Sequence, residues 1–437
     1  MSSIVLEKYS SALKDVDTLR YSGRVSKVIG LTIESIGPPV NIGEICEITP
    51  ARGGKPIKAE VVGFRDNIVL LMPLGDMEGI GPGSGVTANG GTLKVPVGEE
   101  MLGRILDGLG VPIDGRGPLR FSTLYPVSNS PPNPLARKRI TEVLELGIKS
   151  IDGLLTCGKG QRIGIFSGSG VGKSTLLGMI ARNTSADINV IGLIGERGRE
   201  VREFIENDLG EEGLKRSVVV VATSDQPALV RLKSAQLVTA IAEFFRSQGK
   251  DVILMMDSLT RVALAQREVG LAIGEPPVSR GYTPSVFAML PKLLERTGTA
   301  EKGSITGLYA VLVDGDDLNE PIADTARGIL DGHIVLSRNL ANKSHYPAVD
   351  ILQSISRVMP NIVDKEHLEY ARRVKDVAAV YKNAEDLISI GAYNPGSNPE
   401  IDYAIEKIDD INAFLKQEIN EKISFEGTLE QMKMLLD

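Results

Sequence analysis

Residues 167–175 of this 437-residue chain read Ser-Gly-Ser-Gly-Val-Gly-Lys-Ser-Thr, and this stretch decides the fold. It follows an apolar, β-like run over 162–166 and precedes residues 176–180, whose apolar side chains recur at helical spacing. A glycine-rich turn that leads from a strand into a helix and ends in Lys-Ser predicts a phosphate-binding loop. The first position departs from the G-x-x-x-x-G-K-S/T pattern because it is Ser167, which can restrict the turn but removes no ligand.

The residue types of this loop suit phosphate chemistry. Gly168, Gly170 and Gly172 let backbone N–H groups wrap the phosphates, and the start of the helix adds partial positive charge. Lys173 is expected to reach the β- and γ-phosphates, and Ser174 is expected to coordinate Mg²⁺. The other residues predicted to contact the nucleotide are Ser169, Val171 and Thr175.

Two carboxylates follow other apolar runs of the same region. Asp257 ends the run 252–256, where it would hold Mg²⁺ through water. Glu196 follows the run 189–194, at the end of a strand where α/β sheets place ligands. Glu196 could therefore orient and polarise an attacking water, although the residues alone favour a solvated charged turn at this point.

Between about residues 137 and 337, β-like runs alternate with helical segments. This alternation implies a parallel sheet with helices on both faces. A helix is expected over 228–248, with a stop at Gly249. The last 75 or so residues are predicted to be helical, with a break over 391–398. The predicted strands are 162–166, 189–194, 218–222, 252–256, 308–313 and 334–336.

The first 97 residues follow two other patterns. Residues 1–20 show apolar side chains at helical spacing, which predicts a short amphipathic helix that packs on its own domain or docks to a partner. From 23 to 97, short β-like runs such as 28–33 are separated by Gly and Pro clusters, which predicts a small barrel or sandwich. A connector with an extended Pro-rich loop over 128–134 comes next.

The composition and the absence of certain motifs disfavour several classes of protein. The net charge is −7 and aromatic residues make up 4%, so a nucleic-acid binder or a base-stacking platform is disfavoured. Cys46 and Cys157 form no C-x-x-C pair and indicate reduced thiols. The three histidines are too scattered for a zinc motif. Neither a signal peptide nor a membrane span is recognisable, so a cytoplasmic location is expected, with any action at a membrane exerted through partners.

Three further stretches make the chain resemble the type III protein-export ATPases, and among these most of all the flagellar export ATPase. They are GERGREVREFIENDL at 195–209, the segment 255–298, and the segment 331–360, which includes SHYPAVDILQSISRVMP. This family is related to the catalytic and non-catalytic subunits of the rotary F-type ATP synthase. The resemblance covers the chain from about Gly23 to the C-terminus, and rotary catalytic subunits resemble 274–298 only loosely.

The resemblance implies an α/β fold with a RecA-like P-loop NTPase core, an N-terminal β-barrel and a C-terminal helical domain. The expected parts are an N-terminal helical segment over 1–22, the barrel over 23–97, the ATPase domain over 98–362 and the helical domain over 363–437. A homohexameric ring with ATP sites between subunits is implied as well. The implied partners are a peripheral regulator, a central stalk protein, export-gate proteins at the membrane, and export substrates with their chaperones, but no nucleic acid.

The resemblance also assigns roles within the site. Glu196 matches the carboxylate that activates water, and Asp257 matches the Mg²⁺-side aspartate. Two catalytic arginines are implied: Arg197 matches the arginine beside that glutamate, and Arg261 matches one that follows that aspartate. The segment 168–175 matches the phosphate loop.

Two residues are assigned from the segment 331–360. Tyr346 resembles the aromatic side chain that lies against adenine, although ordinary packing would also account for it. Arg357, in the sequence Ser-Ile-Ser-Arg, matches the arginine finger that reaches the γ-phosphate bound to the neighbouring subunit.

These implications favour Mg²⁺-dependent ATP hydrolysis that drives or regulates type III protein export. Flagellar export is favoured over virulence-type secretion on overall similarity, including the tail 414–435, although the two classes share every catalytic motif. A non-catalytic nucleotide-binding ring subunit is a different possibility, but related subunits of that kind lack the glutamate found at 196. An RNA-translocating ring motor is disfavoured by the acidic charge and the scarce aromatics.

Overall fold

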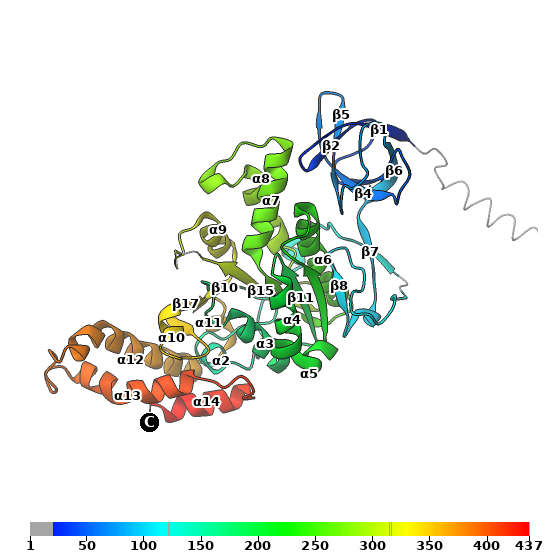
Figure 1. The fold of residues 1–437 in the computed structure, drawn as a ribbon. Helices are drawn as coiled ribbons and strands as arrows, with labels where there is room; N and C mark the ends of the chain where they lie inside the picture. Colours follow the sequence, from blue (N-terminus) through cyan, green and yellow to red (C-terminus); the bar gives the residue numbers. More distant parts are fainter. Residues whose placement is uncertain (1–20, 121–122, 314, 316, 437) are drawn as a thin grey trace, which may run out of the picture. The chain divides into compact units, whose positions relative to one another are not determined.

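The computed structural model describes residues 21–120, 123–313, 315 and 317–436. The predicted N-terminal helix over 1–20 therefore lies outside the described residues. The described chain forms two compact units (Figure 1). Of the described residues, the first unit comprises those up to Leu93 together with Pro227–Leu229 and Glu268–Glu275, and the second comprises the rest.

The first unit contains a closed β-barrel in the strand order β1-β2-β5-β4-β3-β6, which decides between the predicted barrel and sandwich. Its interior is filled by apolar side chains such as Ile33, Ile48 and Val61. The β-like run over 28–33 is not one strand, because the chain turns at Gly30, whose φ is 54°. The two halves pair as a hairpin instead. The barrel strands are β1 (Ser22–Ile29), β2 (Thr32–Ile36), β3 (Glu44–Thr49), β4 (Ile57–Arg65), β5 (Ile68–Pro73) and β6 (Gly85–Thr92).

The second unit is built on a sheet in the order β17-β16-β10-β15-β13-β11-β12-β8, with β14 beside β15. Neighbours from β16 to β8 run parallel, as the alternating pattern predicts. β17 is antiparallel to β16 and was not predicted, because this edge strand is half exposed and lacks a continuous apolar run. The strands are β8 (Ile105–Asp107), β10 (Arg162–Ser167), β11 (Ile188–Ile194), β12 (Ser217–Ala222), β13 (Asp251–Asp257), β14 (Gly298–Thr299), β15 (Ser304–Leu312), β16 (Gly332–Leu336) and β17 (Val349–Ser356).

Helices cover both faces of this sheet. Along β11, Ile191 and Leu193 belong to the apolar cluster that includes α3, whereas Gly192 faces Val238 of α6. The helix predicted over 228–248 is confirmed as α6 and ends before Gly249, whose φ is 84°. The helices of this unit up to the sheet edge are α2 (Lys149–Leu154), α3 (Lys173–Asn183), α4 (Gly198–Glu203), a π-helix η3 (Phe204–Leu209), α5 (Gly210–Lys215), α6 (Ala228–Ser247), α7 (Leu259–Ile273), α8 (Pro284–Leu294), α9 (Pro321–Ile329), α10 (Arg338–Asn342) and α11 (Met359–Ile362).

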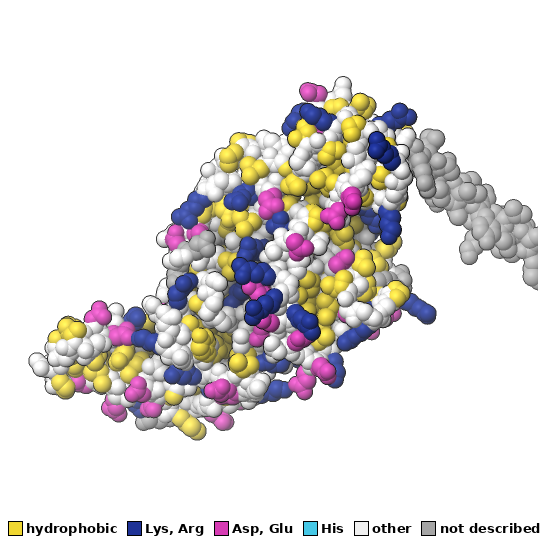
Figure 2. Space-filling view, viewed as in Figure 1, with side chains coloured by type: hydrophobic (Ala, Val, Ile, Leu, Met, Phe, Trp, Pro, Cys, Tyr) yellow, Lys and Arg dark blue, Asp and Glu magenta, His cyan; other side chains and the backbone are white. Residues whose placement is uncertain are grey.

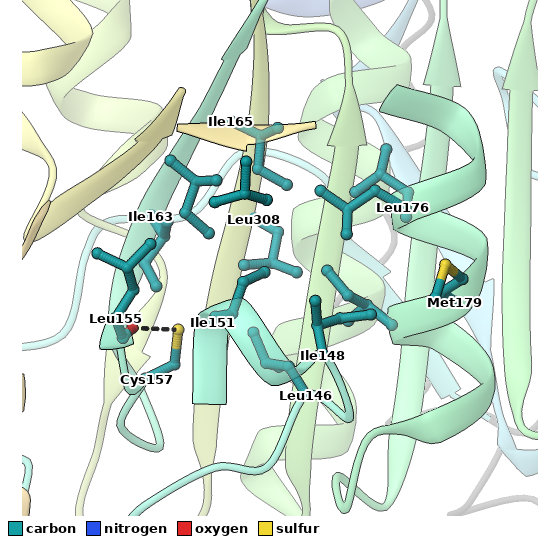
Figure 3. Packing of buried hydrophobic residues seen from close by; sticks show 14 of the residues in the cluster. Leu146, Ile148, Ile151, Leu155, Cys157, Ile163, Ile165, Leu176, Met179 and Leu308 are labelled. Atoms are coloured by element: carbon teal, nitrogen blue, oxygen red, sulfur yellow. Dashed lines mark hydrogen bonds between the residues drawn. The ribbon is translucent and has the colours of Figure 1, made fainter. Parts of the chain in front are cut away.

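The core between α2, α3 and the sheet fixes the position of the loop after β10. Figure 3 shows side chains of residues 146–151 packed toward α3 and toward β10 and β15. Leu146, Ile148 and Ile151 are completely buried there, with Leu176 and Met179 on α3 almost so. Burial of such side chains stabilises the fold by about 1.5–3 kcal/mol each. The α3 helix is therefore held firmly under the nucleotide loop.

The segment between the barrel and the nucleotide-binding core pairs with itself. β7 (Lys94–Val97) lies antiparallel to β9 (Thr123–Pro126) and outside the barrel, and the barrel unit ends at Leu93. The predicted barrel range 23–97 includes β7, because a short Val-rich run after a Gly pair looks the same as one more barrel strand. Short 3₁₀ segments in the loops include η1 (Glu99–Met101), η2 (Pro134–Ala136) and η4 (Ser279–Gly281).

The C-terminal part is helical, as predicted. The expected break over 391–398 separates α12 from α13. Asp364, Asn398 and Ser424 cap the three helices by accepting backbone N–H bonds. Within the described residues, no helix is both long and apolar enough to span a membrane. The helices are α12 (Lys365–Ser389), α13 (Pro399–Leu415) and α14 (Phe425–Met434).

Candidate nucleotide site

The predicted phosphate loop lies between the carboxyl end of β10 and the start of α3. Gly170 and Gly172 have φ values of 77° and 87°, which L-residues with a side chain rarely adopt. Gly172 is the N-cap of α3, and no side chain caps the helix there. The first-turn N–H groups and the positive end of the helix are thus available to an anion.

The departure at Ser167 has no conformational consequence. Ser167 is the last residue of β10 and pairs with Leu312 and Leu336 on the neighbouring strands. It is not among the residues with positive φ. Glycine is therefore not needed at this first position, because the backbone there is still in strand conformation.

Three charged side chains from different elements meet beside the loop. Lys173 Nζ lies 2.5 Å from Asp257 Oδ1, at the end of β13, and 3.9 Å from Glu196 Oε1, after β11. β11 and β13 are hydrogen-bonded neighbours, with Leu193 opposite Asp257, which brings the two carboxylates together. The side chains of Glu196 and Asp257 are only 14% and 5% exposed. Glu196 is therefore not the solvated turn residue that the sequence alone favours.

Burial raises the pKa of Glu196 to about 7, and the negative charge of Asp257 raises it as well, whereas Lys173 lowers it. The ordinary pKa of a glutamate is 4.5. Between pH 4.5 and about 7, the folded chain therefore keeps a proton on Glu196 that the unfolded chain has lost. The folded state is then destabilised as pH rises from about 4.5 to about 7.

We expect Glu196→Gln, which cannot ionise, to escape this loss of stability. The melting temperature of the variant should exceed that of the unaltered chain by a margin that grows between pH 5 and 7 and is constant above, measured without nucleotide. A margin independent of pH would contradict the raised pKa.

Arg261 lies at the turn that carries Glu196. Gly195, with φ of 75°, packs against it so closely that a Cβ there would be 2.7 Å from the Arg261 Cβ. The Nε of Arg261 is buried and has no hydrogen-bond partner among the described residues. A buried donor of this kind calls for an acceptor, and bound phosphate would supply one.

Tyr346 lies next to the last glycine of the loop. Its ring is beside Gly172, where a Cβ would lie 3.5 Å from Tyr346 Cδ1. The residue is 46% exposed, so one part of its surface is free for a ligand. Ordinary core packing does not account for this exposure.

Arg197 does not join the charged cluster. Its side chain is 79% exposed, and its nearest ion-pair partner is Glu200, at 3.7 Å. It precedes α4, whose arginines Arg199 and Arg202 form exposed pairs along the helix. Basic and acidic side chains are intermingled in the middle of the face seen in Figure 2. Arg197 is thus not brought to the nucleotide loop of its own chain.

Arg357 lies near the amino ends of β10 and β16, at the end of these strands opposite the phosphate loop. Its backbone N–H donates to Asp331 O, and its guanidinium donates to Leu330 O and Arg327 O. Asp331 in turn binds Arg162, the first residue of β10. The phosphate loop begins at the other end of this six-residue strand, roughly 17 Å away at about 3.3 Å per residue. Arg357 therefore cannot serve the site of its own chain in this conformation.

Comparison with known proteins places these features in a family. Residues 147–356 match the nucleotide-binding domain of the ATP synthase alpha/beta family, and residues 25–90 match the beta-barrel domain of that family. Residues 363–434 match the T3SS EscN ATPase C-terminal domain. The flagellum-specific ATP synthase of Bacillus subtilis is 59% identical over 96% of both chains. The chain belongs to the type III export ATPase family.

Other export ATPases support the same assignment. The flagellum-specific ATP synthase of Treponema pallidum is 52% identical over 100% of this chain and 97% of its own. The type 3 secretion system ATPase of Xanthomonas euvesicatoria is 50% identical over 96% and 95%. The predictions of family, of fold class, and of ATPase activity in type III export are confirmed.

Solved structures of an export ATPase have the same fold. The assembled ATPase EscN of the enteropathogenic E. coli type III secretion system matches with a TM-score of 0.90 and 48% identity, over 95% of this chain and 100% of EscN. EscN in complex with its central stalk EscO matches with a TM-score of 0.88 and 47% identity, over the same shares.

The export ATPase family implies a nucleotide substrate and a divalent metal, and the donor groups of this chain fit Mg²⁺. Ser174 and Asp257 both offer oxygen atoms, and Mg²⁺ in such sites takes one or two protein oxygens, with phosphates and waters completing its shell. Asp257 is buried and already neutralised by the Lys173 ammonium, which shows that the position accommodates a cation.

Sequence reasoning missed two polar residues that support the loop. Asp208, in the π-helix η3, accepts a hydrogen bond from Thr175, which opposes the rise in the pKa of Asp208 that burial causes. Gln417, after α13, is 5% exposed and its N–H donates to Tyr346 O. No motif marks either residue, although a π-helix is often found at a functional site once the structure is known.

Proposed function

We propose that this chain hydrolyses Mg²⁺-bound ATP at the loop 168–175 and that the hydrolysis energises or regulates flagellar type III protein export. The observation that carries the proposal is the meeting of Lys173, Asp257 and Glu196 at the mouth of this loop. This arrangement provides a cation for phosphate, an oxygen ligand for a metal ion, and a base for water.

The reaction needs positioning and charge neutralisation more than covalent chemistry. The loop N–H groups and Lys173 would hold the phosphates, and Lys173 would exchange Asp257 for the β- and γ-phosphates as its partner. Ser174 and Asp257 would hold Mg²⁺, whose charge would offset that of the phosphates. Tyr346 would lie against adenine, and Arg261 would donate to phosphate oxygens from the buried turn.

Glu196 would orient the attacking water and accept its proton. Its pKa of about 7 in the structure without nucleotide suits a base that works near neutrality, because a base must be partly ionised yet able to hold a proton. Since related non-catalytic ring subunits lack this glutamate, its presence beside Lys173 favours a catalytic subunit.

The assembly and partners are proposed from those of the solved relatives and from the family resemblance. The solved relatives are an assembled EscN and its complex with a central stalk, so we propose a homohexameric ring with a stalk partner for this chain. A peripheral regulator, export-gate proteins, and export substrates with chaperones would complete the system. We further propose a cytoplasmic location, close to the inner face of the cell membrane through these partners.

Flagellar function is favoured because three flagellum-specific relatives are 52–59% identical over nearly the whole chain, against 48–50% for two type 3 secretion relatives. The two classes overlap in identity, since other flagellum-specific relatives are 47–48% identical and a type III secretion ATPase structure is 53% identical over 79% of the chain. Restored filament protein secretion in a strain that lacks its own flagellar ATPase would test this choice. Absence of secretion, with the chain expressed and active as an ATPase, would point to the virulence-type alternative.

The assembled ring is expected to be the active form. Phosphate release per chain should therefore rise with chain concentration and reach a plateau as the ring forms, with Mg²⁺ required throughout. Sedimentation at the same concentrations would relate activity to assembly. A constant activity per chain, with a demonstrated monomer at the low end, would contradict a site shared between subunits.

A further inference from the structure

We propose that Gln417, in the segment between α13 and α14, is a positioning residue that sets Tyr346 in place for the base of the nucleotide. The proposal rests on the proposed function of this site and on the role of Tyr346 in it. It assigns to the C-terminal helical domain a direct part in nucleotide affinity.

Gln417 is the centre of a buried hydrogen-bond network. Its backbone N–H donates to Tyr346 O at 3.0 Å. Its side chain accepts from Lys149 N at 2.9 Å and donates to Gly147 O at 2.9 Å and to Glu421 O at 3.1 Å. Gln417 is 5% exposed, and its side-chain amide uses both its oxygen and its nitrogen to join residues 147–149 to its own loop. Together with the backbone bond to Tyr346, Gln417 connects three segments that are distant in sequence.

The segment that receives the Gln417 side chain is rigid. Gly147 has a φ of 71°, and a Cβ there would lie 2.4 Å from the Cβ of Asn183, the last residue of α3. The completely buried Asp152 carboxylate accepts the N–H groups of Leu146 and Gly147 at 3.0 and 2.8 Å. Together with the packing in Figure 3, these contacts bind the segment to the helix that carries the phosphate loop.

Two outer contacts hold the same loop of the helical domain. Arg182, near the end of α3, donates to Ile419 O at 2.8 Å, and Lys149 Nζ lies 2.9 Å from Glu421 Oε1. The loop around Gln417 is therefore attached to α3 and to the segment before α2, while its N–H holds Tyr346. The Gln417 side chain thus fixes the position of Tyr346 relative to α3, the helix that follows the phosphate loop.

This geometry predicts which kinetic constant depends on Gln417. Removal of the side chain leaves Lys149 N and Gly147 O buried without their partner, which is unfavourable, so the loop should shift and release the Tyr346 backbone. Lys173, Glu196 and Asp257 are not bonded to Gln417, so the chemical step should remain. The affinity for the base should fall while the rate at saturation is retained.

The test is Gln417→Ala, with Asn189→Ala as the matched control. Asn189 is another buried side-chain amide of the second unit, bonded to Ala181 O and Ser217 Oγ at the start of β11, and it has no bond to Tyr346. Melting temperatures of both variants would measure the general cost of losing a buried amide. KM and kcat for ATP would then be compared between the two variants.

For Gln417→Ala we expect KM for ATP to rise about tenfold with kcat changed less than about twofold, while Asn189→Ala leaves KM unchanged. Inorganic tripolyphosphate, which has no base, should inhibit both variants with unaltered affinity. The chain has no tryptophan, so Tyr346→Trp provides a single tryptophan, which can be excited selectively over the tyrosines, and its quenching by ATP should weaken when Gln417→Ala is added.

Three outcomes would overturn the proposal: an unchanged KM, a KM that rises equally in Asn189→Ala, or a parallel loss of tripolyphosphate affinity. Tyr346→Ala separates this failure from that of the proposed function. If Tyr346→Ala raises KM and Gln417→Ala does not, only the role of Gln417 is wrong. If neither variant alters KM, the base does not lie on Tyr346, and the proposed site fails with it.

Discussion

Replacement of Glu196 by Gln is expected to stop turnover while ATP binding persists. The amide keeps the size of the side chain but cannot accept the proton of water, and a positioned general base contributes about 10²–10⁴-fold to such a rate. Lys173 and the loop N–H groups stay in place, so the phosphates should still be held. Because Lys173 no longer has a second negative charge 3.9 Å away, ATP binding should be as tight as before or tighter. Phosphate release and equilibrium binding of ATP measure the two effects separately.

Glu203→Gln is the matched control for this variant. Glu203 lies seven residues further on, in the same charged segment, but its side chain is 49% exposed and its partner is the exposed Arg199. Its replacement should leave turnover within about twofold, since exposed ion pairs contribute little. Near-normal turnover in Glu196→Gln, or an equal loss in Glu203→Gln, would refute the assignment of the base.

Replacement of Arg357 by Ala is expected to slow hydrolysis by about 10³–10⁵-fold, the usual contribution of an arginine finger, or roughly 4–7 kcal/mol of barrier. ATP affinity should change far less, because Arg357 lies near the amino end of β10, whereas the phosphate loop of its own chain follows the carboxyl end of that strand. Among the described residues, its guanidinium bonds to backbone carbonyls at the end of α9, and these bonds, at 3.3 and 3.4 Å, are long. The group can leave them for a neighbouring subunit.

Mixing the two inactive variants decides whether Arg357 acts across the interface. In a mixed ring, a site with intact Glu196 on an Arg357→Ala chain can receive Arg357 from a Glu196→Gln neighbour, so activity should return. If Arg357 acted within its own chain, every site in the mixture would lack one of the two groups and activity would stay absent. The control is a mixture of Arg357→Ala with Lys173→Ala chains, which should recover activity in the same way, because that neighbour also supplies Arg357.

The sequence by itself predicted the parallel sheet, the phosphate loop and the identity of the charged residues, because these depend on local patterns. Apolar runs that alternate with segments of helical periodicity predict parallel strands. A Gly-rich turn after such a strand places Lys173 at the carboxyl end of the sheet. Asp257 was predicted because it ends such a run. Glu196 was less certain from the residues alone, because a charged turn has the same composition whether it is exposed or buried.

What the sequence did not predict depends on contacts between distant segments. The antiparallel edge strand β17 is half exposed, so its periodicity is weak, and its direction follows from its pairing with β16. The place of β7 beside β9 likewise depends on a partner about 30 residues away. Both arginines were assigned from motifs, but their exposure differs: Arg197 stays in solvent, whereas Arg261 is half-buried, packs against Gly195 and has a buried Nε.

The composition and motifs of this chain determined its fold class, its phosphate loop and its chemistry, because the residue types that bind phosphate act at short sequence spacing. Only the tertiary structure decided that the Glu196 carboxylate is buried beside Lys173, that Arg357 faces away from its own site, and that Gln417 connects Tyr346 to the segment before α2. The physical reason is that burial, pKa and hydrogen-bond partnership are properties of the surroundings of a side chain, and those surroundings come from other segments of the chain, 23 residues away for Lys173 and Glu196 and 268 residues away for Lys149 and Gln417.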